Sequence, residues 1–157
     1  MKKLMISSTL MLLIVQSGFA QETINVAEGY VFFAPGVASP GGEGMAHLGL
    51  GGELLFKGFG VGPEIGWLAP LRNFGDGIGT FSPNVSYHFR NTKLSPFLTG
   101  GYTLFFRDGR ANGFNFGGGV DYWLSNKTGL RFEVRDNVMS QYRDTHFVGF
   151  RFGVSFR

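Results

Sequence analysis

The 157-residue sequence contains no cysteine. Without a thiol, the chain has no disulfide framework, no thiolate metal site, no cysteine nucleophile and no cysteine that can carry a lipid. Charged residues make up only 16% of the chain. This low charge argues against disorder, which is favoured by many charges and few aromatic residues. These absences leave a packed, apolar chain with the length of one domain.

Long apolar runs are confined to the start of the chain. Residues 1–20 combine two early lysines, an apolar stretch from Leu4 to Val15 and a small-residue end at Ala20, which are the three parts of a cleaved secretory signal. The stretch is shorter than the roughly 20 residues of a spanning helix. We therefore expect residues 1–20 to be removed and 21–157 to form the mature domain, in which no apolar run is long enough for a transmembrane helix.

An excess of charge of one sign is also lacking. Removing Lys2 and Lys3 with the signal lowers the formal net charge from +3 to +1. The arginines are dispersed among acidic residues and form no basic stripe. We therefore expect no nucleic-acid partner.

What the sequence does contain is many small and aromatic residues, with 26 glycines and 18 phenylalanines. They follow a two-residue alternation, which is typical of a strand with two different faces. Near the C-terminus, apolar Phe150 and Phe152 alternate with Gly149, Arg151 and Gly153. The pattern recurs in eight segments: 23–33, 47–56, 61–67, 80–89, 98–107, 114–124, 130–138 and 146–156.

The first segment fits the pattern least well. Val26, Tyr30 and Phe32 share the face that we expect to be apolar, together with Ile24, but Glu28 falls on that same face. This conflict indicates either a β-bulge that shifts the register or a wrong strand assignment.

The composition of the two faces predicts which of them meets water. In a soluble barrel or sandwich the polar face carries large solvated groups, whereas here it is mostly Gly, Ser, Thr and Asn. Small residues fit the inside of a narrow barrel, and aromatic residues fit lipid. Because only helices and closed barrels satisfy all backbone groups in a membrane, we predict an all-β, eight-stranded antiparallel up-and-down transmembrane β-barrel. The alternative is a secreted soluble barrel with its apolar face inside.

The links between the segments alternate in length. The short links are 57–60, 90–95 and 125–128, and the others are 34–44, 69–79, 108–112 and 140–144. Outer-membrane barrels have short periplasmic turns and longer external loops, so we expect the short links and both chain ends in the periplasm. Aromatic residues near the strand ends are candidates for the two interfacial girdles: Trp67, Tyr87, Phe89, Phe106, Tyr122 and Phe156.

Strand patterning and glycine placement also carry a family resemblance. The stretches concerned are Tyr87-His88-Phe89, Ser95-Pro96-Phe97 leading to Gly100-Gly101-Tyr102, Phe114 to Val120, and Gly129 to Arg135. In them the chain resembles the small outer-membrane β-barrel family of Gram-negative bacteria, which is related in architecture to the transmembrane domain of outer membrane protein A. The resemblance implies a place in the outer membrane, with membrane lipid as the surrounding partner.

The resemblance further implies insertion by the barrel assembly machinery, which reads an aromatic C-terminal strand. The stretch Val148 to Phe156 resembles that signal, and Arg157 follows as a departure from members that end on the aromatic residue. A monomer is the expected oligomeric state.

Charged side chains on the predicted inner face are the candidate functional residues. A buried lone ion is costly, so these groups need partners. We predict a charge network in the lumen formed by Glu53, Glu64, Asp121, Arg131, Glu133, Arg135 and Arg151. Arg107 is expected near an outer rim, and His47 and His88 on the same inner face.

Our main hypothesis is a structural role in the envelope, in which the network fills the lumen and holds the strands in register. The alternative is a narrow porin-like passage for ions or small solutes, lined by the same side chains. No large pore is expected, because eight strands leave an interior just wide enough for side chains.

Catalysis has less support. Some barrels of this architecture deacylate or acylate lipid A, and deacylation needs a serine activated by a histidine and an acid. None of His47, His88 and His146 stands in the His-x-Ser arrangement of the deacylases, although Ser86 and His88 share the inner face. We therefore expect no enzymatic activity.

No cofactor and no metal are expected either. The glycine clusters lack phosphate-binding spacing, and no group of histidines and acids has the spacing of a metal site. Binding of a ligand at the cell surface through the links 34–44 and 69–79 remains a further alternative.

Overall fold

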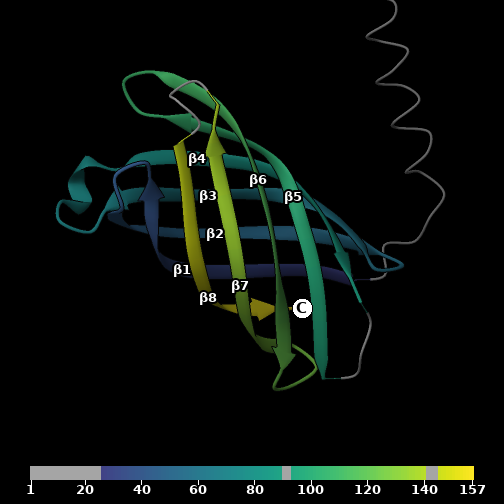
Figure 1. The fold of residues 1–157 in the computed structure, drawn as a ribbon. Helices are drawn as coiled ribbons and strands as arrows, with labels where there is room; N and C mark the ends of the chain where they lie inside the picture. The colour runs from purple at the N-terminus through teal and green to yellow at the C-terminus, as the bar shows by residue number, and fades with distance from the viewer. Residues whose placement is uncertain (1–25, 90–92, 141–144) are drawn as a thin grey trace, which may run out of the picture.

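The computed structural model describes residues 26–89, 93–140 and 145–157, which form one closed antiparallel barrel (Figure 1). Its strands are β1 (Val26–Ser39), β2 (Glu43–Phe56), β3 (Phe59–Pro70), β4 (Ile78–His88), β5 (Leu94–Phe106), β6 (Arg110–Trp123), β7 (Thr128–Met139) and β8 (Thr145–Phe156). Each strand pairs with its neighbours in sequence, and β8 pairs with β1. The predicted eight-stranded up-and-down barrel is thereby confirmed, while the expected signal at residues 1–20 lies outside the described residues.

The two faces of the barrel have opposite polarity. Large apolar side chains are exposed on the outside of every strand, as Leu50, Val85 and Phe150 illustrate, and buried polar or charged side chains fill the inside. In water this belt would far exceed the apolar patches of soluble proteins. In lipid the same belt is favourable, so the apolar face lies outside and the alternative of a soluble barrel with an apolar core is wrong.

Within the described residues, no helix combines the length and apolar character that crossing a membrane requires. The one helical element there is the short 3-10 turn η1 (Phe74–Asp76).

The barrel has two mouths. We call the mouth beside Val26 and Arg157 the chain-end mouth, and the opposite one, beside residues 40–42 and 71–77, the loop mouth (Figure 1). The aromatic residues that are candidates for the two girdles are distributed between the two mouths. Trp67 and Phe106 lie near the loop mouth, and the other four, Tyr87, Phe89, Tyr122 and Phe156, lie near the chain-end mouth.

The face assignment of the first strand was wrong. Tyr30 is 5% exposed and points into the lumen with Phe32 and Glu28, whereas Val31 is 44% exposed on the outside with Phe33. The pairing of β1 with β2 runs without a slip along the whole strand. No β-bulge is therefore needed, because Glu28 lies on the polar inner face like the other lumen acids.

The cause of this error is visible in the lumen. Both faces of β1 are apolar in sequence, so alternation alone did not distinguish them. The inward rings of Tyr30 and Phe32 lie 4.3 and 4.0 Å from the guanidinium groups of Arg131 and Arg151. These cation–π contacts stabilise aromatic rings inside a charged lumen, and they involve partners far away in sequence.

Two expected loops are shorter than the sequence indicated. β1 and β2 pair as far as Ala38 and Glu43, so the link predicted at 34–44 is a turn of residues 40–42, and the link at 69–79 shrinks to 71–77. Proline and glycine suggested a loop at 34–44, but Pro35 belongs to β1. It lies where the pairing of β1 with β8 is interrupted, which suits a residue without an N–H group to donate.

A two-residue turn joins β2 to β3. Lys57 has φ of 49° and Gly58 has φ of 94°, the positive pair of a type I′ turn, whose twist matches that of the flanking strands. A Cβ atom at Gly58 would lie 2.9 Å from the carbonyl oxygen of His88. The tight turn therefore requires glycine at its second position.

Replacing Gly58 with alanine is expected to lower the free energy of unfolding by about 1–2 kcal/mol, because a side chain disfavours this backbone conformation. Urea unfolding of the refolded barrel in lipid vesicles measures the change. The matched control is Gly109→Ala in the β5–β6 turn, where an added Cβ meets nothing within 4 Å. Equal effects of the two substitutions would contradict the argument.

Candidate functional site

The charged residues predicted for the lumen are brought together inside the barrel. The side chains of all seven come from β2, β3, β6, β7 and β8, and the residues are between 0% and 8% exposed. They divide into two clusters that differ in position along the barrel axis. Arg131 joins the clusters, because its Nε lies 3.5 Å from Glu133.

The central cluster consists of Glu64, Glu133, Arg135 and Arg151. The Arg151 Nη1 atom lies 2.7 Å from Glu64 Oε2, and the Arg135 Nη1 atom lies 3.3 Å from the same oxygen. Arg135 Nε also donates to Glu133 Oε1, and Arg151 Nε lies 4.0 Å from it. Two acids and two bases thus balance each other, which reduces the cost of burying them.

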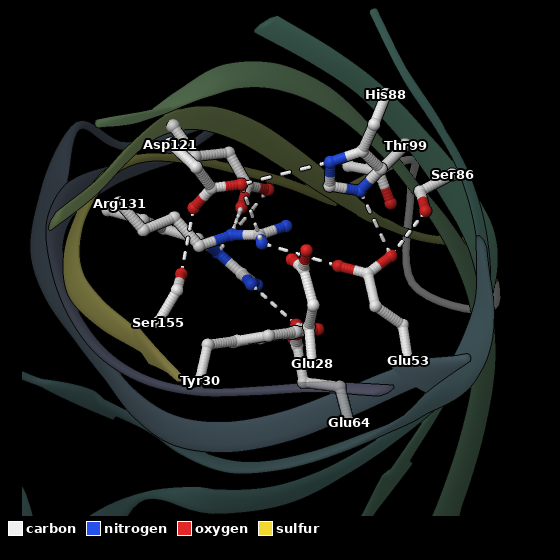
Figure 2. A network of polar contacts seen from close by, with 12 residues as sticks. Glu28, Tyr30, Glu53, Glu64, Ser86, His88, Thr99, Asp121, Arg131 and Ser155 are labelled. Atoms are coloured by element: carbon white, nitrogen blue, oxygen red, sulfur yellow. Dashed lines mark hydrogen bonds and ion pairs between the residues drawn. The ribbon is translucent and has the colours of Figure 1, made fainter. Parts of the chain in front are cut away.

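The chain-end cluster contains Glu28, Glu53, His88, Asp121 and Arg131 (Figure 2). The Arg131 Nη1 atom lies 3.3 Å from Glu53 Oε1 and 3.4 Å from Asp121 Oδ2. His88 Nε2 lies 3.2 Å from Glu53 Oε2. Sequence reasoning did not include Glu28 in the network, because the residue had been placed on the outer face.

Arg157 lies at the chain-end mouth, between Glu28 and Trp123. Arg157 Nε lies 2.7 Å from Glu28 Oε1, and its guanidinium stacks 3.7 Å from the Trp123 ring. Arg131 is held in a similar way, 3.9 Å from the ring of Phe97. Aromatic rings therefore supply the surfaces on which Arg131 and Arg157 lie.

An uncharged polar layer lies between the central cluster and the loop mouth. His47 Nε2 and Thr80 Oγ1 are 3.0 Å apart, and Asn115 Nδ2 donates to Thr103 Oγ1 over 2.9 Å. These hydrogen bonds satisfy side chains that are cut off from water, as buried polar groups require.

Above the polar layer, an apolar layer occupies the loop mouth. It consists of one inward side chain from each strand between β2 and β8: Met45, Leu68, Ile78, Phe105, Ala111, Met139 and Phe147. Four of them are buried and the others pack against these four. Sequence reasoning did not identify this layer, although Phe147 already stood on the small and charged face of its strand.

On the described part of the outer face, an acid and a histidine meet near the loop mouth. The alternation had placed Asp136 on the apolar face, and its Oδ2 atom lies 2.8 Å from His146 Nδ1. At the same mouth, Arg107 Nη2 lies 3.4 Å from Asp76 Oδ1. Arg107 is therefore at a rim, outside the two lumen clusters.

Ser86 and His88, which share the inner face, both contact the carboxylate of Glu53. Ser86 Oγ donates to Glu53 Oε2, and His88 Nε2 lies 3.2 Å from that same oxygen. A nucleophilic serine needs the histidine beside its hydroxyl, whereas here a carboxylate stands between the two.

No family model matches the sequence, and no curated protein matches it. Solved structures do share its fold. The N-terminal β-barrel domain of Pseudomonas aeruginosa OprF is 15% identical, with a TM-score of 0.61 over 83% of this chain and 96% of that one. Neisserial surface protein A is 14% identical, with a TM-score of 0.63 over 83% of this chain and 94% of its own. The outer membrane enzyme PagL is 17% identical, with a TM-score of 0.51 over 82% of this chain and 99% of its own.

Proposed function

We propose, from the premise that this chain is a small β-barrel of the cell outer membrane, that its main role is structural and that its lumen is closed. One observation carries the proposal: the two charge clusters lie beneath the apolar layer of the loop mouth, and their side chains are shielded from solvent. Eight strands leave an interior that side chains can fill.

The apolar layer favours a closed lumen over a narrow passage. Ions cross a hydrophobic constriction only when it is wetted, and here seven strands each contribute an apolar side chain to one level. The observation that favours a passage is the run of polar groups from the chain-end mouth up to Thr80 and Thr103. The two candidate functions therefore differ in whether the apolar layer opens.

Bilayer conductance distinguishes these functions. We expect the purified wild-type barrel to give no sustained current in planar lipid bilayers. Truncation of the layer by Leu68→Ala, Phe105→Ala and Phe147→Ala together is expected to produce small, steady currents, because water then reaches the polar layer. The matched control is Phe114→Ala, an exposed aromatic residue on the outer face, which leaves the lumen unchanged.

A sustained wild-type current that the triple substitution does not alter would overturn the closed lumen and support the narrow passage. Each variant is first checked on a denaturing gel, with and without boiling. A closed barrel that stays folded in the unboiled sample migrates as a compact band.

We do not assign an enzymatic function. PagL shows that the fold accommodates an enzyme. In this chain, Glu53 binds both Ser86 and His88, so the serine hydroxyl donates to a carboxylate instead of to the histidine. Lipid A from cells that express the protein is expected to have unchanged acylation in mass spectrometry. A loss of acyl chains that depends on Ser86 would contradict this proposal.

We further propose an orientation and partners for the barrel in the membrane. The loop mouth faces outward and the chain-end mouth faces the periplasm, as short periplasmic turns and longer external loops imply. The barrel is a monomer in membrane lipid, inserted by the barrel assembly machinery through β8. A surface that binds a ligand is the weaker alternative. Its candidate site is residues 71–77, the longest described connection at the loop mouth.

A further inference from the structure

Three potential metal ligands meet at the chain-end mouth. Glu28 from β1, His88 from β4 and Asp121 from β6 are all buried, and one donor atom of each lies within 4.8 Å of the others. Figure 2 shows the three side chains converging from different sides of the lumen. One imidazole nitrogen and two carboxylate oxygens are a donor set that zinc and related divalent transition metals accept.

The histidine is oriented as in known metal sites. Its Nε2 atom lies 3.2 Å from Glu53 Oε2, while Nδ1 faces Asp121 Oδ2 at 3.9 Å, which is beyond hydrogen-bond distance. Metal-binding histidines usually donate their second ring N–H to a carboxylate, which fixes the ring and its tautomer. Donation from Nε2 to Glu53 leaves the lone pair of Nδ1 directed at the other two ligands.

The buried carboxylate of Glu28 is an independent observation that favours a bound cation. Glu28 is 4% exposed, and its Oε2 atom has no hydrogen-bond partner, whereas Oε1 is bound by Arg157. A buried acceptor without a partner is costly, more so when it is charged. A cation held between Glu28, His88 and Asp121 removes that cost.

The charges favour a divalent ion. The central cluster is balanced in itself, whereas in the chain-end cluster the carboxylates of Glu28, Glu53 and Asp121 face Arg131 inside the lumen and Arg157 at its edge. The side chain of Arg157 is one-third exposed, so it can swing out to solvent. Three carboxylates, Arg131 and one divalent cation then sum to zero.

We propose that the chain-end mouth is a binding site for a divalent transition-metal ion such as Zn²⁺, with Glu28, His88 Nδ1 and Asp121 as ligands. Glu53 is a positioning residue that holds His88. Arg157 competes with the metal for Glu28 and leaves when the ion binds. Ca²⁺ and Mg²⁺ prefer all-oxygen ligand sets and bind more weakly here.

Calorimetric titration of the folded full-length barrel in detergent micelles tests the site, with Zn²⁺ as the probe and Ca²⁺ in parallel. We expect one Zn²⁺ per barrel. Glu28→Gln and His88→Gln are each expected to abolish this binding, and Glu53→Gln to weaken it by roughly 10–100-fold. Glu43→Gln removes the same charge at an exposed position by the loop mouth and is expected to leave binding unchanged.

Arg157→Gln provides a test that loss of folding cannot imitate. Removing the competing guanidinium is expected to tighten Zn²⁺ binding while the gel band of the folded barrel persists. The proposal is overturned if the wild-type barrel does not bind Zn²⁺, if Glu28→Gln and His88→Gln bind it as the wild type does, or if Arg157→Gln leaves the affinity unchanged.

Discussion

Replacing Arg135 with methionine is expected to lower the free energy of unfolding by about 3–5 kcal/mol, the range observed when one partner of a buried ion pair is removed. Arg135 is 1% exposed and lies between Glu64 and Glu133. Methionine removes one guanidinium group from both carboxylates. Because the carboxylates are buried, water cannot replace the lost positive charge. Urea unfolding of the barrel in lipid vesicles measures the loss.

An exposed arginine is the matched control. The side chain of Arg107 is 40% exposed and pairs with Asp76 at the loop mouth, so Arg107→Met is expected to cost about 0–1 kcal/mol. Adding Glu133→Gln to Arg135→Met should restore part of the lost stability, because the central cluster then again holds equal numbers of acids and bases, Glu64 and Arg151. If Arg135→Met costs no more than Arg107→Met, the central cluster does not stabilise the barrel.

An arginine at the middle of the outer belt is expected to destabilise the barrel by about 2–4 kcal/mol, the cost of a basic residue near the midplane of a bilayer. Phe150 provides the position, because it is 59% exposed on the outer face and lies halfway along β8. The expected loss for Phe150→Arg is measured by unfolding in lipid vesicles.

Depth in the membrane supplies the control for this experiment. Phe156 lies on the same face at the end of β8, so Phe156→Arg is expected to cost only about 0–1 kcal/mol, as near a membrane interface. Equal costs at the two positions would mean that the belt does not follow the profile of a bilayer. The apolar outer face would then need another partner than lipid.

Much of the fold followed from a local signal. Within β8, Phe150 points outward and Arg151 inward, as the two-residue alternation predicted. The pattern works because successive side chains of a strand point to opposite faces whatever the strand is paired with. Strand number, the apolar outer face and the inward direction of the lumen charges are therefore properties that the sequence predicts on its own.

The prediction failed where both faces of a strand are apolar. In β1 the inward rings of Tyr30 and Phe32 are stabilised by Arg131 and Arg151, which lie more than a hundred residues further along the chain. Likewise, Pro35 suggested a loop, yet the interrupted pairing with β8 accommodates it within the strand. Neither partner is visible in the neighbouring sequence.

By itself, the sequence determined which residues line the lumen and which face lipid in β2 to β8, because alternation along a strand is a local property. The tertiary structure alone decided which of these residues meet. Glu28, His88 and Asp121 converge, and seven apolar side chains share one level, because closure and register place residues of distant strands at the same height. That height depends on pairings around the whole ring, and a register shift of one residue would reverse every face.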